Sequence, residues 1–189
     1  GFYWGLIEMY KIIVKMILFV CPLIFFSNSS FAISLSELQT VSQFVNVGSK
    51  NDGDAYLNVD SIQSIRYNPP YYSLKYTTYY VNYNQGYILE TEEISNYDYN
   101  YSYEMLFKNN KLSNIKTFDA FKAEVIRLKY HNSGIEGGHR IKKVYNLDGV
   151  LIEDLSSSFY GYESKEIKFL TIGYDLAAEA FYKAYQLRF

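Results

Sequence analysis

A period of two dominates the tyrosine-rich middle of the chain. From Tyr71 to Tyr83, a mainly apolar face alternates with a face that begins polar and turns aromatic. Successive side chains of a strand point to opposite faces of a sheet, so this pattern predicts a strand. Beyond the turn residues Asn84-Gln85-Gly86, Tyr87–Ile94 is predicted as its partner. A stricter alternation of aromatic and polar residues predicts a further strand over Tyr97–Phe107.

Turn sequences recur at strand-length spacing and predict an antiparallel meander. Asp148-Gly149 is the clearest, because Asp-Gly supplies the positive φ of a type I′ turn; it predicts a hairpin between Ile141–Asn146 and Val150–Leu155. Other turn sequences delimit strands predicted at Phe44–Gly48, Ala55–Val59 and Leu112–Phe118, namely Asn51-Asp52-Gly53-Asp54, Asn68-Pro69-Pro70 and Asn109-Asn110. Further along, Val125–Tyr130 is compatible with another strand, and Asn132–Gly138 is typical of a loop.

The pattern changes to a helical period at the C-terminal end. Between Tyr174 and Leu187 the apolar residues recur every three or four positions, which predicts a helix starting near Gly173 or Asp175. A helix across one face of an antiparallel β-meander gives the α+β class. A small outer-membrane barrel of eight strands is the alternative, because the last residues alternate up to Phe189; the helical spacing and the short strands argue against it.

The segment from Met9 to Ala32 is typical of a cleaved secretory signal. Lys11 and Lys15 precede an uncharged apolar run, Met16–Phe26, which is followed by small and polar residues. Residues 1–8 then lie upstream of the natural start, and 33–189 form one domain. An uncleaved membrane anchor is the alternative, although the uncharged run is shorter than the roughly 20 residues that span a bilayer. A lipid anchor is disfavoured, because Cys21 lies inside the apolar run.

The amino-acid composition excludes several kinds of site and of binding partner. Cys21 is the only cysteine of the chain, so residues 33–189 hold neither a disulfide nor a thiol, and a zinc–thiolate site is excluded there. The net charge of −2 gives no electrostatic case for nucleic acid. Tyrosine is the strong bias, since twelve of the 22 tyrosines fall between Tyr67 and Tyr103.

Polar clusters give weak grounds for chemistry. His131, Glu136 and His139 have metal-ligating side chains but an irregular spacing in a glycine-rich segment, which an exposed loop explains as well. The acidic residues near the 51–54 turn lack the calcium-loop order and are better explained as turn residues: Asp52, Asp54, Asn58 and Asp60.

The sequence also lacks the short catalytic and phosphate-binding motifs. Glu92 and Glu93 are predicted to point to opposite faces of a strand, so they do not pair as acid and base. We therefore expect a non-enzymatic protein with no catalytic, cofactor-binding or metal-binding residues and no cofactor.

The tyrosines are the remaining candidates for a binding surface. Tyrosine combines a large contact area, a low entropy cost and a polar tip. The expected binding face consists of Tyr71, Tyr79, Tyr83, Tyr97, Tyr99 and Tyr101. The competing interpretation is that they serve as cross-strand pairs that hold the sheet together.

Three short segments of the sequence resemble those of a known family. Asp52–Ile62, Tyr67–Tyr72 and Phe181–Tyr185 are similar to segments of small exported proteins related to the surface-adhesin protein E of Gram-negative-type bacteria. The resemblance extends over most of 41–189. It implies an antiparallel sheet packed on a C-terminal helix, a periplasmic or cell-surface location and, for the adhesin itself, binding of host matrix proteins.

We therefore expect an exported binding or adhesion domain whose partner is a host or envelope protein. A periplasmic small-ligand carrier with an aromatic pocket is the first alternative. An unrecognised hydrolase is the second, and it would need His131 or His139 beside a nucleophile in a cleft.

Overall fold

The computed structural model describes residues 32–50, 52–109, 112–158 and 162–189. The segment interpreted as a signal, residues 9–32, lies outside this set except for Ala32. Six antiparallel strands follow one another across the sheet: β1 (Phe44–Lys50), β2 (Gly53–Asn68), β3 (Tyr71–Asn82), β4 (Tyr87–Asp98), β5 (Ile135–Asn146) and β6 (Leu151–Asp154). The two-residue strand β7 (Lys165–Glu166) pairs with β5 as a seventh.

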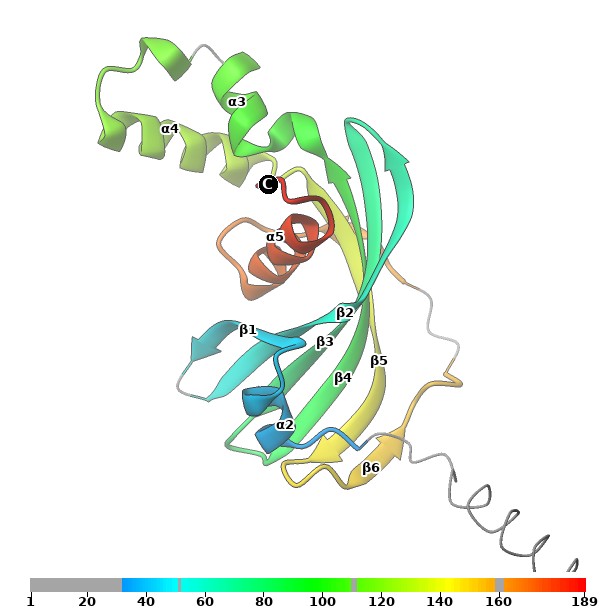
Figure 1. The fold of residues 1–189 in the computed structure, drawn as a ribbon. Coiled ribbons are helices and arrows are strands. Elements are labelled where there is room, and N and C mark those ends of the chain that lie inside the picture. The colour runs from blue at the N-terminus through cyan, green and yellow to red at the C-terminus, as the bar shows by residue number, and fades with distance from the viewer. Residues whose placement is uncertain (1–31, 51, 110–111, 159–161) are drawn as a thin grey trace, which may run out of the picture. The chain divides into compact units, whose positions relative to one another are not determined.

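The helices lie before, between and after these strands (Figure 1). Helix α2 (Leu35–Thr40) precedes β1, and α5 (Ile172–Tyr185) follows β7. Between β4 and β5 the chain forms η2 (Tyr99–Tyr101), α3 (Tyr103–Asn109), η3 (Leu112–Asn114) and α4 (Phe118–His131). Of the helices in the described ranges, none is long and apolar enough to cross a membrane.

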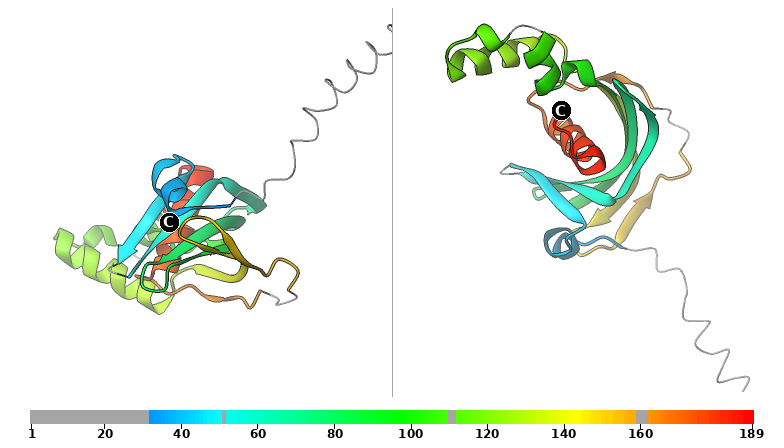
Figure 2. Two further views of the ribbon diagram at one scale, coloured as in Figure 1. Left: turned by 90° about the horizontal axis from the view of Figure 1, so that it is seen from below. Right: turned by 45° about the horizontal axis from the view of Figure 1, so that its top comes forward.

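The predicted α+β fold is confirmed. The sheet curves around α5, which lies against its concave face (Figure 2). Thr171 caps this helix, because its Oγ1 accepts a hydrogen bond from the backbone N–H of Tyr174 at 3.2 Å. Its buried residues recur at helical spacing, as the sequence predicted: Leu176, Ala177, Ala180 and Phe181.

Both faces of the sheet are covered, but unequally. The larger core lies between α5 and one face, where the ring of Phe181 contacts those of Tyr72 and Tyr97 at centroid distances of 5.1 and 4.8 Å. A smaller core lies on the opposite face, where Leu38 of α2 packs with strand residues that include Tyr79. We call these the α5 face and the outer face.

The strand predicted over Tyr97–Phe107 is wrong. β4 ends at Asp98, whose carboxylate accepts a hydrogen bond from the Asn100 N–H and starts η2. Ser102 then accepts a hydrogen bond from the Met105 N–H at the start of α3. Such side-chain caps offer the backbone an alternative to a sheet ladder, and they decide the structure here despite the alternating tyrosines.

The prediction for the region before β5 was also wrong in three places. Leu112–Phe118 forms η3 and the start of α4 instead of a strand, and Val125–Tyr130 lies inside α4, which Thr117 caps through the Ala120 N–H. β5 begins at Ile135, inside the predicted loop.

The predicted hairpin at Asp148-Gly149 is confirmed. It joins β5 and β6, and Gly149 has a φ of 89°, in the left-handed region that glycine favours. The β3–β4 pair is regular throughout, with Thr77 opposite Glu92 and Tyr76 opposite Glu93.

Candidate functional site

The six tyrosines expected to form one binding face are divided between two faces. Tyr97 is buried on the α5 face, and Tyr99 stacks on Phe181 there at a centroid distance of 5.7 Å. Tyr79 is buried on the outer face, where its ring meets that of Phe44 edge-on at 5.5 Å. Tyr83 donates a hydrogen bond to Asp54, and this bond raises the pKa of Tyr83 to about 12. These four tyrosines have structural contacts of their own.

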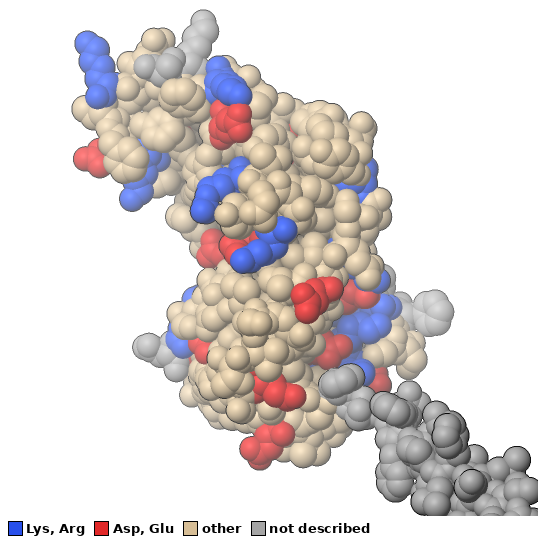
Figure 3. Space-filling view, viewed as in Figure 1, with Lys and Arg blue, Asp and Glu red and all other residues tan. Residues whose placement is uncertain are grey.

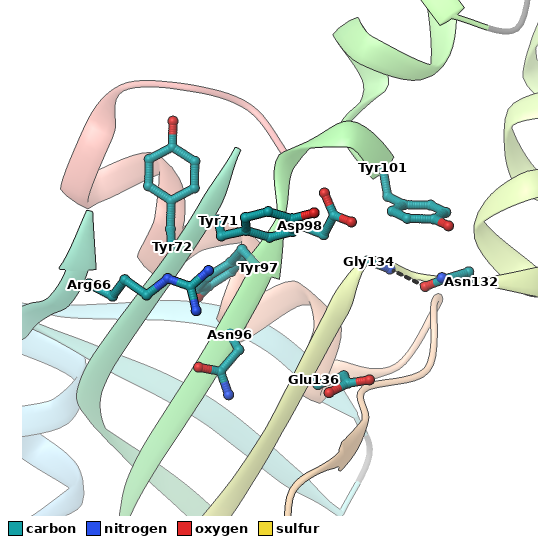
Figure 4. A pocket seen from close by; sticks show the side chains of 10 residues that line it. All are labelled: Arg66, Tyr71, Tyr72, Asn96, Tyr97, Asp98, Tyr101, Asn132, Gly134 and Glu136. Carbon is teal, nitrogen blue, oxygen red and sulfur yellow. Dashed lines mark hydrogen bonds between the residues drawn. The ribbon is translucent and has the colours of Figure 1, made fainter. Parts of the chain in front are cut away.

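Tyr71, Tyr101 and the largely buried Tyr97 line a groove beside the ends of β3 and β4 (Figure 4). The groove has a volume of about 260 Å³. Asp98 is drawn between the rings of Tyr71 and Tyr101, and the guanidinium of Arg66 lies over the Tyr71 ring, 5.2 Å from its centroid. Asn96 and Glu136 continue the lining along the outer face. The groove therefore offers an aromatic pair, one cation and two carboxylates.

The connection between α4 and β5 fixes the position of Tyr101. The Asn132 side chain accepts a hydrogen bond from the Gly134 N–H at 2.8 Å, the bond drawn in Figure 4. Gly134 has a φ of 77°, and a Cβ at this position would lie 2.3 Å from the Cβ of Tyr101. Only glycine fits both this backbone conformation and this close approach. The groove wall is thus built by the fold.

The β2–β3 hairpin beside the groove has exposed apolar and aromatic side chains. Ile65, Tyr67 and Tyr71 have exposed fractions of 55%, 68% and 44%. Pairing between β1 and β2 extends only as far as Asn58, so the distal part of β2 has a strand neighbour on one side alone within the described chain. We call Ile65, Arg66, Tyr67 and Tyr71 the hairpin surface.

A charged cluster lies further along the outer face. Glu92 binds Lys75 Nζ at 2.7 Å and Arg140 Nη2 at 3.0 Å, and it accepts a hydrogen bond from Tyr162. Burial alone would raise the pKa of Glu92, but these three partners outweigh it and lower the pKa to about 2. Glu92 is therefore ionised at neutral pH, in an ion pair that joins β3, β4 and β5.

Lys129 is a fully buried lysine of α4. Its Nζ donates to the Tyr174 hydroxyl at 2.6 Å and to the main-chain oxygen of Phe189 at 2.9 Å. It also lies 4.5 Å from the ring centroid of Tyr103 and 4.8 Å from that of Phe189. Burial lowers the pKa of Lys129 to about 7. Because it bonds Tyr174 of α5, we interpret Lys129 as a link between α4 and α5.

The residues singled out as metal ligands do not come together. Among the described residues, no group of three His, Asp, Glu or Cys side chains is placed to hold a metal ion. His131 ends α4, whereas Glu136 and His139 lie on β5 at positions of opposite parity and so on opposite faces. Lys, Arg, Asp and Glu are also interspersed over the visible surface, with no field of one sign (Figure 3).

Sequence reasoning missed most of the hairpin surface. It selected Tyr71 but neither Ile65, Arg66 nor Tyr67, because the predicted strand ended at Val59 and left these residues unassigned. The strand actually continues to Asn68. The available signal was the strand-favouring residues Ile62, Ile65 and Tyr67, interspersed with polar residues before Asn68-Pro69-Pro70. A scan against protein-family models and searches of curated proteins and of solved structures gave no match to this chain.

Proposed function

We propose that this protein is an exported, non-enzymatic binding domain that attaches to a host or envelope protein through the hairpin surface. The observation that carries the proposal is the exposure of Ile65, Tyr67 and Tyr71. Arg66 lies over the Tyr71 ring, and the Tyr67 ring lies on the other face of the hairpin, against Tyr72 and Tyr185. Tyrosine and arginine are the residue types that most often dominate the binding energy of protein interfaces. Elsewhere on this sheet, tyrosines such as Tyr79 and Tyr97 are buried, so exposure distinguishes this hairpin.

The open edge of β2 supports a polypeptide partner. Beyond Val59, whose N–H donates to the Gln43 carbonyl at 2.9 Å, the strand has backbone groups on its β1 side without a neighbouring strand in the described chain. An extended peptide can add to such an edge, with its backbone groups giving affinity and its side chains giving specificity. The exposed rings of the hairpin then lie beside the added strand.

The adjoining groove supplies polar specificity. Arg66 is held over Tyr71, and the carboxylates of Asp98 and Glu136 line the same groove. A hydrophobic centre with polar groups at its rim is the usual composition of a protein interface. The resemblance to surface-adhesin protein E points to matrix proteins as the first partners to test.

The test is binding of the full chain to immobilised collagen, fibronectin and laminin, measured by surface plasmon resonance. The double variant Tyr67→Ala/Tyr71→Ala should weaken binding by about tenfold or more, since truncating interface tyrosines removes central contacts. Tyr130→Ala is the matched control, because Tyr130 is 63% exposed but lies on α4. Absence of binding by the wild type, or equal binding by the double variant, would refute the proposal.

A further inference from the structure

A second cavity lies on the α5 face, and it contains a carboxylate that the proposed function does not use. Its volume is about 630 Å³, within the range of small-molecule sites. The sheet contributes Tyr80, Glu93 and His139, and the chain entering α5 contributes Ile167 and Ile172. Glu93 lies between these residues, and the ion-pair residues Glu163, Lys165, Glu166 and Lys168 also line the cavity.

The carboxylate of Glu93 has only uncharged hydrogen-bond donors. Its Oε1 accepts from the Thr78 hydroxyl at 3.0 Å and from the Tyr80 hydroxyl at 3.2 Å. Its Oε2 has no hydrogen-bond partner, and no lysine or arginine pairs with Glu93, among the described residues. Exposed His139 lies directly across the β4–β5 ladder from Glu93.

The lysines at the rim do not neutralise this carboxylate. Lys165 pairs with Glu163 at 2.9 Å, and Lys168 pairs with Glu166. Each lysine charge at the rim is therefore matched locally. The negative charge of Glu93 is left facing the cavity with one oxygen available.

We propose that this cavity binds a small organic cation, with a primary ammonium group on Glu93 Oε2 and an apolar body between Tyr80 and the isoleucines. An ammonium supplies the charged donor that the carboxylate lacks, and charge-assisted hydrogen bonds are stronger than neutral ones. The tyrosine ring adds a face that attracts cations. A metal ion fits less well, because the described residues bring no second and third ligand to Glu93.

Burial raises the pKa of Glu93, which agrees with a carboxylate that lacks a permanent counter-ion. An ammonium ligand would supply that counter-ion and would favour the ionised carboxylate. The ammonium has two sources in biology, a free amine or a lysine side chain of another protein, and the experiment separates them.

The test is isothermal titration calorimetry of the full chain with 2-phenylethylamine, with its neutral analogue 2-phenylethanol, and with Nα-acetyl-lysine methylamide. We expect the amine to bind and the alcohol to bind at least about tenfold more weakly. Binding of phenylethylamine alone assigns the site to free amines, and binding of the lysine derivative assigns it to a protein side chain. If neither ammonium compound binds, or if the alcohol binds equally well, the proposal is overturned.

Glu93→Gln should lower the affinity for the ammonium compound by about tenfold or more, while keeping the hydrogen bonds from Thr78 and Tyr80 to the side-chain oxygen. Glu104→Gln on α3 is the matched control, because it removes the same charge from an exposed ion pair, with Lys108, that does not line the cavity. Circular dichroism establishes that both variants fold. Equal affinity of Glu93→Gln and wild type would overturn the proposal, whatever the result for the hairpin surface.

Discussion

Glu92 and Glu93 are neighbours in sequence on the same strand, yet they lie in opposite environments. Glu92 points to the outer face, where Lys75 and Arg140 hold its charge. Glu93 points to the α5 face, where hydroxyl groups are its hydrogen-bond donors. The pKa of Glu92 falls to about 2, whereas burial raises that of Glu93. The partner residues on adjacent strands, and not the glutamate itself, decide which form is stable.

The two faces of the sheet differ in the same way as the environments of Glu92 and Glu93. On the α5 face, burial is extensive and aromatic, so a polar group there must be neutral or find a partner inside. On the outer face the small core under α2 gives way to charged pairs. The α5 face thus supplies most of the stability, and the outer face adds pairs whose value depends on pH.

The largest expected effect is in the α5-face core. Phe181→Ala should lower the free energy of unfolding by about 3–5 kcal/mol, because Phe181 is fully buried among the rings of Tyr72, Tyr97 and Phe189. Urea denaturation followed by circular dichroism measures it. Phe118→Ala is the control: Phe118 is 76% exposed, and a change within about 0.5 kcal/mol is expected.

The corresponding truncation on the outer face is Leu38→Ala. We expect about 2–3 kcal/mol, at the low end for buried leucine, because α2 is short and packs against a small cluster. A loss equal to or greater than that of Phe181→Ala would contradict the view that the α5 face supplies most of the stability.

How far the sequence alone could predict these faces depends on what covers each one. In α5, helical spacing and burial coincide, so the pattern identified the helix. In β3, the alternating pattern identified the strand. Both faces of this strand carry tyrosine and both are covered, so residue type alone did not predict which rings would be exposed. Around Tyr97–Tyr103, Asp98 and Ser102 start helical turns inside an apparently alternating run, and their capping role depends on a backbone geometry that the period-of-two pattern conceals.

The opposite orientation of Glu92 and Glu93 was predictable from the strand period, but their partners were not. Lys75 lies near in sequence, whereas Arg140 and Tyr162 reach Glu92 only because β5 and the following chain return to β4. The residues around the Glu93 cavity were not predictable either, because part of its lining comes from the chain before α5. To predict such long-range contacts, one must know which residues of β5 lie opposite those of β4. The sequence pattern did not give this register, because a helical insertion separates the two strands.

Replacing each glutamate by glutamine should separate the two environments at pH 7. Glu92→Gln should lower the free energy of unfolding by about 1–2 kcal/mol, because Lys75 and Arg140 lose their counter-ion at a partly buried site. Glu93→Gln should be neutral or stabilising, since it removes a charge that burial disfavours. Equal destabilisation by the two substitutions, measured by urea denaturation, would remove the contrast on which this comparison rests.

The pH dependence of the same variants has opposite signs. The folded-state pKa of Glu92 lies below the ordinary value of 4.5, so its stabilisation is present above pH 4.5 and is lost as the pH falls towards about 2. The destabilisation by Glu92→Gln should therefore shrink over that window. For Glu93 the folded-state pKa is raised, so the penalty for its charge is absent below pH 4.5 and grows as the pH rises through the folded-state value. Denaturation curves from pH 2 to 7 that show no divergence between the variants would contradict both assignments.

The smallest effect compares two tyrosine hydroxyls, one on each face. Tyr97 donates to the main-chain oxygen of Ala177 at 2.9 Å inside the α5-face core, and Tyr145 donates to Glu90 at 3.0 Å on the outer face. Tyr97→Phe should cost about 1 kcal/mol, because water cannot replace the lost donor at a buried carbonyl. Tyr145→Phe should cost about 0.5 kcal/mol or less, because Glu90 is only partly buried and water can solvate its carboxylate. Thermal unfolding of both variants measures the difference, and a larger loss for Tyr145→Phe would mean that the outer-face hydroxyl is the better shielded of the two.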